Sequence, residues 1–268
     1  MLRLWSVLAP VRVTATYALA LGLVEVTLVQ LGPHVQDRVI DHLSTNLHNL
    51  THGHLGTLIG SAFVTGDDRV YAWLPGLVCL LAVGELLWSG KRLVVAFTLG
   101  HVGATLIIAV GLATAVQSGW LPASIADASD VGISYGAAAV VGTLTAAVPV
   151  RWRPAWVCFW LANALAVAVP VNGYDFSASG HVVALALGMV LATRFRSPAQ
   201  WTLPRLILLA GGVVFGYVAL IGFSTGTPAA GIAAASIAVV ARSAGYRWNT
   251  RDRSHSVAPQ EYAHAFAD

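Results

Sequence analysis

Long apolar segments separated by short charged stretches are the feature that most restricts how this chain can fold. Runs of about 20 mostly apolar residues, enough for a helix to cross the hydrocarbon core of a bilayer, recur along most of the sequence. Only 10% of the 268 residues are charged, whereas soluble domains carry about 25%. Lipid is therefore the expected solvent for most of the surface. The sequence predicts an all-α, polytopic transmembrane helix bundle.

Eight segments are predicted to span the membrane. The first follows an N-terminus that has no small-residue cleavage site, which favours a retained span over a signal peptide. The predicted spans are 12–31, 70–88, 92–116, 132–150, 155–171, 178–194, 204–223 and the shorter 228–241.

The basic residues favour one orientation of these spans. With the N-terminus in the cytoplasm, thirteen of the fifteen basic residues fall inside, and only Arg38 and Arg69 fall outside, as the positive-inside rule requires. Counting the apolar segment 48–66 as a ninth span would invert this pattern, so we place it in the outer loop, at or dipping into the interface. Because the basic residues are scattered between spans, they indicate topology and not a nucleic-acid partner. Fourteen of them are Arg, which favours a GC-rich bacterial source and hence the bacterial plasma membrane, with both termini cytoplasmic.

Two polar motifs lie at the outer ends of predicted spans. Ser134, within GISYG, opens the fourth span, and His181, within SGHVVALALG, lies about three residues into the sixth. Both spans run from outside to inside, so both side chains are expected roughly 5 Å below the outer boundary. A serine becomes a good nucleophile only when an adjacent base takes its proton. Each motif alone also fits small-residue packing or an interfacial histidine, and it is their matched depth that favours a catalytic pair.

These motifs resemble those of the rhomboid intramembrane serine proteases over about residues 12–195, and the chain is similar to a divergent, actinobacterial-type member. In that family a Gly-x-Ser nucleophile opens the fourth span, as in Gly132-Ile133-Ser134, and the sixth span carries the base, as at His181 with Gly188. The resemblance implies a Ser134/His181 dyad without a third acid, acting on a membrane-tethered protein near the outer leaflet and needing no cofactor or metal.

The same resemblance divides the chain into three parts. It implies a rhomboid-like six-span core over 1–195, two additional spans over 196–241, and a cytoplasmic tail over 242–268 that we expect to be disordered. The end of the second span, Gly84-Glu85 followed by a short basic turn at Lys91-Arg92, also matches the family pattern. The sequence does not indicate an oligomeric state.

The chain departs from the family at the residues that would support the oxyanion. Tyr135 follows the serine where rhomboids usually have Gly, and the second span lacks the usual His and Asn. The nearest candidates are Asn49, His52 and His54 in the outer loop, which with Gly132 and Tyr135 make up the predicted oxyanion and substrate region. Losing one oxyanion donor costs about 3 kcal/mol. The alternative is therefore a catalytically inactive rhomboid-like protein that binds other membrane helices.

Other ionisable residues suggest two further interpretations. His48, His52 and His54 have a spacing that could suit a transition metal, but polar anchoring at the interface is the favoured interpretation and no metal is expected. Glu25 and His101 lie within predicted spans, where ionisable groups are costly and usually functional. A small transporter is thus a third and weaker alternative.

Overall fold

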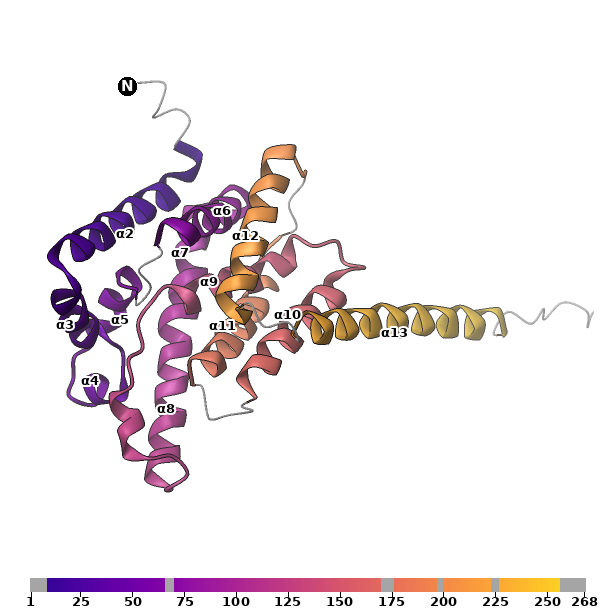
Figure 1. Cartoon of the computed structure of the whole chain (residues 1–268). Coiled ribbons are helices and arrows are strands. Elements are labelled where there is room, and N and C mark those ends of the chain that lie inside the picture. Colours follow the sequence, from indigo (N-terminus) through magenta and orange to yellow (C-terminus); the bar gives the residue numbers. More distant parts are fainter. Residues whose placement is uncertain (1–8, 66–69, 170–175, 197–199, 223–226, 256–268) are drawn as a thin grey trace, which may run out of the picture.

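The computed structural model describes residues 9–65, 70–169, 176–196, 200–222 and 227–255, and the regular elements within these ranges are helices (Figure 1). The predicted all-α bundle is confirmed. The last helix continues to His255, past the point at which the sequence predicts a disordered tail, and residues 256–268 of that tail lie outside the described ranges.

Each segment predicted to span the membrane contains a helix within the described residues. Within the described ranges, Ala9–Leu31, Gly90–Gln117 and Leu203–Ile221 are long and apolar enough to cross a membrane by themselves, and further apolar helices are shorter. The helices are α2 (Arg12–Leu31), α6 (Val70–Trp88), α7 (Gly90–Thr98) continued by the π-helical turn η3 (Leu99–Gly103) and α8 (Ala104–Gln117), α9 (Ser134–Thr143), α10 (Arg153–Ala168), α11 (Phe176–Ala192), α12 (Leu203–Ile221) and α13 (Thr227–His255).

Helix α9 lies at the centre of the bundle (Figure 1). Every residue from Tyr135 to Thr143 is buried, and most are Ala, Gly or Val, which let neighbouring backbones approach closely. A Cβ on Gly188 of α11 would lie 2.7 Å from the carbonyl carbon of Ala139, and one on Gly100 of η3 would lie 2.7 Å from the carbonyl oxygen of Tyr135. Close packing against α11 and the third span therefore fixes the rotation of α9.

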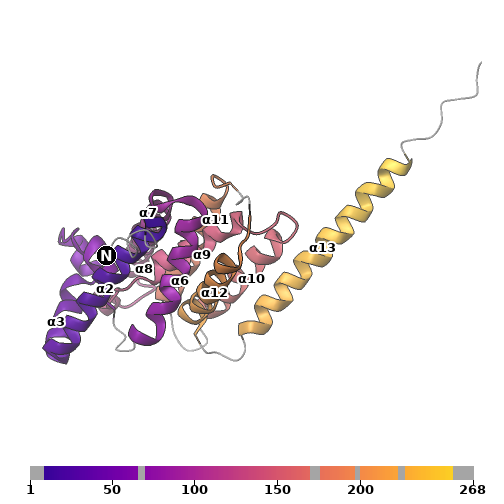
Figure 2. The ribbon, with the colours of Figure 1, turned by 90° about the horizontal axis from the view of Figure 1, so that it is seen from above.

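The two C-terminal helices pack on different parts of this core. Helix α12 lies against α6 and α9: a Cβ on Gly212 would lie 2.8 Å from the Cα of Leu80, and one on Gly216 would lie 2.8 Å from a methyl group of Val141. Helix α13 packs along α10 and extends beyond the bundle (Figure 2).

The outer loop after α2 folds back into the bundle. Thr65 donates its backbone N–H to Oε1 of Glu25 at 2.7 Å, and the Tyr17 hydroxyl donates to the carbonyl oxygen of Ala62 at 2.6 Å. The segment 57–65 therefore lies against α2, so this part of the loop dips between the spans. The short elements of the loop are α3 (Pro33–Leu43), α4 (Leu47–Thr51), α5 (Thr57–Gly60) and η2 (Ser61–Phe63).

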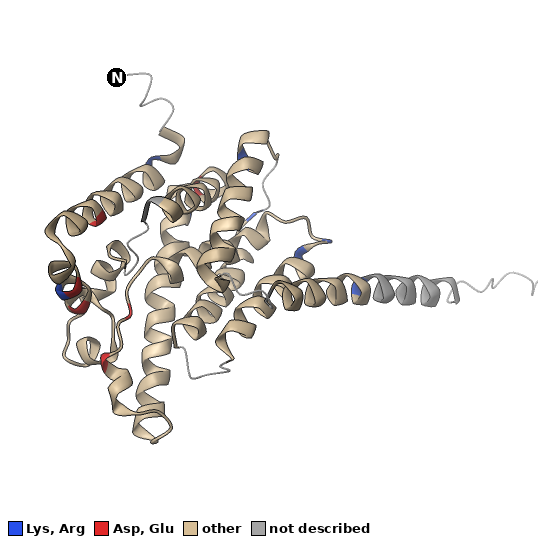
Figure 3. Cartoon of the chain, viewed as in Figure 1, with Lys and Arg blue, Asp and Glu red and all other residues tan. Residues whose placement is uncertain are grey.

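Glu85 holds the start of α2 against the end of α6. Its carboxylate accepts the backbone N–H groups of Val13 at 3.0 Å and Thr14 at 2.8 Å, and the Thr14 hydroxyl at 2.8 Å. The first N–H groups of a helix have no partner within the helix, so a carboxylate there satisfies them and interacts favourably with the helix dipole. Figure 3 shows further acidic residues on α2, on α3 and in the stretch before α9, and basic residues on α3, within α13 and near the ends of other helices.

Candidate site around Ser134 and His181

Ser134 is the first residue of α9 and follows a turn that requires glycine. Gly132 has φ +116°, a left-handed conformation that residues with a Cβ rarely adopt. Its N–H donates to the carbonyl oxygen of Ser61 at 2.9 Å, so the loop segment 57–65 positions the start of α9. The Gly-x-Ser motif thus has a structural role in this turn.

Ser134 is half-buried and lines a cavity of about 350 Å³ between α6, α12 and the turn before α9. Trp73 contributes from α6 and Phe215 from α12. Most of the cavity wall is apolar. The other lining residues are Thr65, Val131, Gly132, Ile133, Val218 and Ala219.

His181, near the start of α11, lies against Tyr135. The two ring centroids are 5.4 Å apart and the planes are nearly perpendicular at 83°. Gly180 makes room for this contact, because a Cβ there would overlap the tyrosine ring. Successive residues on a helix are about 100° apart around its axis, so the residue that meets α11 is Tyr135, while Ser134 lines the cavity beside α12. The structure brings Tyr135 and His181 together, while the preceding residue, Ser134, lines the cavity between α6 and α12.

Asp130 adds an acidic group next to Tyr135. Its carboxylate accepts a hydrogen bond from the Thr45 hydroxyl at 3.3 Å, and its N–H donates to the Ser44 hydroxyl at 2.8 Å. Burial raises the pKa of Asp130 to about 6, although hydrogen bonding from the Thr45 and Tyr135 hydroxyls opposes that rise. A sequence search for dyads does not single out Asp130, because it lies in the loop four residues before Ser134 and outside both motifs.

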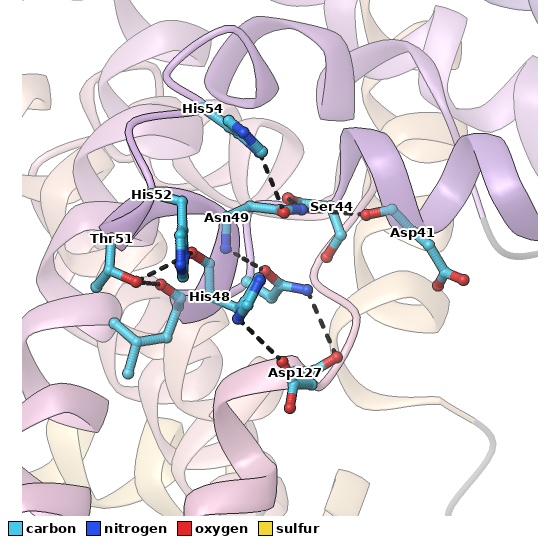
Figure 4. Close-up of polar contacts among 10 residues, drawn as sticks. Asp41, Ser44, His48, Asn49, Thr51, His52, His54 and Asp127 are labelled. Atoms are coloured by element: carbon cyan, nitrogen blue, oxygen red, sulfur yellow. Dashed lines mark hydrogen bonds and ion pairs between the residues drawn. The ribbon is translucent and has the colours of Figure 1, made fainter.

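The outer-loop residues predicted to support an oxyanion form a separate network (Figure 4). Asn49 donates its side-chain amide to the carbonyl oxygens of Asp41 at 3.1 Å and Ser44 at 2.9 Å, and its own oxygen lies 3.4 Å from Nδ1 of His54. Nδ1 of His52 lies 2.8 Å from the carbonyl oxygen of His48. The contacts of Asn49, His52 and His54 stay within this loop and do not reach Ser134 or His181.

His48 extends this network to the stretch before α9. Its Nδ1 lies 3.6 Å from a carboxylate oxygen of Asp127, and its ring lies 4.2 Å from that of His52. Within the described ranges, no cluster of three or more His, Cys, Asp or Glu side chains could hold a metal ion. Through this contact His48 connects the loop helix α4 to the segment 123–127.

A serine–histidine contact that the sequence did not predict lies between the outer loop and the third span. The hydroxyl of Ser61 and Nε2 of His101 are 3.1 Å apart, and both residues are buried. Sequence reasoning missed this pair because its members are 40 residues apart and carry no shared motif. Glu25 holds Thr65 and His101 holds Ser61. The two residues that suggested a transporter therefore both hold the segment 57–65 in place.

Comparison with known proteins gives one match. A family model described as rhomboid-like protein matches residues 10–200. No curated protein and no solved structure matches the chain.

Proposed function

Because the chain belongs to the rhomboid-like protein family and its apolar helices make it a multi-pass membrane protein, we propose that it binds the transmembrane helices of other membrane proteins without cutting them. The observation that carries this proposal is the contact between Tyr135 and His181. A general base must come within about 2.6–3.2 Å of the hydroxyl proton that it removes. We infer that the Tyr135 ring, packed against His181, keeps the Ser134 hydroxyl from the imidazole.

The cavity beside Ser134 is the place where we expect a client helix to dock. It lies between two spans and is lined by aromatic and aliphatic side chains from α6 and α12. Membrane helices associate through close van der Waals packing and a few hydrogen bonds. Trp73 and Phe215 supply the packing surface, and the hydroxyls of Ser134 and Thr65 supply polar groups.

A serine protease of the rhomboid type is the second candidate. It is favoured by the positions of Ser134 and His181 near the starts of α9 and α11, two helices packed closely against each other. Proteolysis through Ser134 and His181 would require Tyr135 to leave His181 so that the serine hydroxyl could approach the imidazole.

Labelling with a fluorophosphonate probe separates the two candidates. Purified protein in detergent is treated with the probe beside Ser134→Ala, His181→Ala and Tyr135→Gly, with folding checked by size-exclusion chromatography. We expect no Ser134-dependent labelling of the natural sequence. Labelling that is lost in both Ser134→Ala and His181→Ala would instead establish the protease.

Helix binding is tested by photo-crosslinking in liposomes to a synthetic transmembrane helix. The crosslinking residue replaces Ala219, which lines the cavity, and in the control it replaces Val214 on the same helix, which is 64% exposed. We expect an intact adduct at position 219 that unlabelled helix competes away. Equal, uncompeted crosslinking at both positions would contradict the proposal, and cleavage of the helix would support the protease.

A further inference from the structure

A second cavity lies on the other side of the bundle, between the start of α2, the loop segment 57–65 and the third span. Its volume is about 230 Å³, and its wall is almost entirely apolar. Ile59 and Val94, which line it, are 69% and 48% exposed. The cavity therefore opens onto the surface between α5 and α7.

The cavity is elongated along the third span. Its lining includes residues from Leu93 to Val102, a stretch of helix about 13 Å long. Two polar atoms deep in its wall already have partners within the protein: the Tyr17 hydroxyl bonds to Ala62, and Nε2 of His101 bonds to Ser61. Nδ1 of His101 is buried without a hydrogen bond. Such a wall suits a flexible hydrocarbon ligand better than a polar one.

One end of the cavity is basic. Arg12 begins α2 and Lys91 follows the first residue of α7, and both are exposed. The two helix starts are in contact, because a Cβ on Gly90 would lie 3.4 Å from the Cβ of Val13. The nearby acid Glu85 is engaged by the backbone of α2. The two cations therefore flank the end of the cavity nearest Leu93.

We propose that this cavity binds one acyl chain of an anionic phospholipid, whose phosphate interacts with Arg12 and Lys91. An apolar cavity that opens on a lipid-facing surface is filled by hydrocarbon, because lipid chains are the surrounding solvent there. Basic residues at the membrane surface attract anionic head groups. The bound chain packs against Ile59 and Phe63 and so supports the loop segment 57–65. This proposal does not depend on Ser134 or on the binding of a client helix.

Native mass spectrometry of the detergent-purified chain tests the site. The protein is titrated with phosphatidylglycerol and, separately, with phosphatidylcholine of the same acyl chains. Val94→Trp fills the cavity, whereas Val95→Trp is the control on the same helix, 55% exposed and outside the lining. We expect Val94→Trp to weaken phosphatidylglycerol binding roughly tenfold or more and Val95→Trp to leave it unchanged. Ile59→Trp replaces Val94→Trp if that variant does not fold.

The head-group contact is tested with the double variant Arg12→Gln, Lys91→Gln. Its control is Arg151→Gln, Arg194→Gln, which removes two exposed cations at other helix ends. We expect the first pair to abolish a preference for phosphatidylglycerol of roughly tenfold and the second pair to retain it. Equal binding of the two lipids by the natural sequence, or binding unaffected by both cavity-filling variants, would overturn the proposal.

Discussion

The contact between α9 and α11 predicts a large effect for one added methyl group. In Gly188→Ala the new Cβ would lie 2.7 Å from the carbonyl carbon and 2.8 Å from the Cα of Ala139, whereas unstrained carbon contacts are about 3.5–4.0 Å. The obstacle is backbone on both sides, so the two helices must separate by roughly 1 Å. Such overpacking costs about 1–3 kcal/mol, and better helix propensity recovers only about 0.5–1 kcal/mol of it.

Gly111→Ala is the matched control. Gly111 lies in α8, and a Cβ there would meet nothing within 4 Å, so alanine should be neutral or stabilise the helix by about 0.5–1 kcal/mol. The assay is thermal unfolding in detergent, followed by tryptophan fluorescence. The propensity gain is common to both variants, so the overpacking of about 1–3 kcal/mol separates them. At about 2–4 °C per kcal/mol, we expect Gly188→Ala to melt roughly 2–12 °C below Gly111→Ala. Melting temperatures within 1 °C of each other would show that α9 and α11 do not pack as described.

Three further predictions concern polar groups outside this contact. Glu85→Gln should lower the free energy of unfolding by about 2–3 kcal/mol, because an amide nitrogen cannot accept the N–H groups that the carboxylate accepts; an unchanged denaturation midpoint would contradict this. Glu25→Ala should release the segment 57–65. The reporter is Ala62→Cys in a background without the native cysteines, because Ala62 is only 6% exposed in the natural fold. Maleimide should label this cysteine at least roughly tenfold faster when Glu25→Ala is also present. Burial raises the pKa of Asp130 from 3.8 to about 6, so the folded state binds this proton more tightly than the unfolded state does. The resulting stabilisation is complete below about pH 4 and is lost as the pH rises through 6, and Asp130→Asn should flatten the dependence of the melting temperature on pH across that window.

The fold could be predicted from the sequence because apolar runs of membrane length leave few alternatives to helices. Helix α2 and its predicted segment have the same bounds, 12–31. The outer loop was harder, because the segment 48–66 is apolar enough to suggest a span, and only the contacts of its residues 57–65 with Glu25 and His101 show that this part dips between the spans.

The candidate site could be predicted only in part. The motif Gly-x-Ser correctly marks a turn that opens a helix, since Gly132 has a positive φ. Matched depth in the membrane, however, says nothing about rotation around the helix axis. The rotation of α9 is set by the small residues that it packs against α11 and the third span. This rotation brings Tyr135 to His181. A single sequence does not encode this choice in any local pattern.

The loop segment 57–65 connects the two cavities through adjacent residues. The carbonyl oxygen of Ser61 accepts the N–H of Gly132 in the turn before Ser134, while its hydroxyl contacts His101. The next residue, Ala62, lines the apolar cavity and accepts the Tyr17 hydroxyl. Ser61 and Ala62 are adjacent, so the contact with Gly132 and the contact with the apolar cavity are joined by backbone alone. A ligand that displaces or supports this segment therefore acts on the backbone that positions Ser134. Glu25 and His101 both hold this segment: Glu25 accepts the N–H of Thr65 at its end, and His101 contacts Ser61 at its middle.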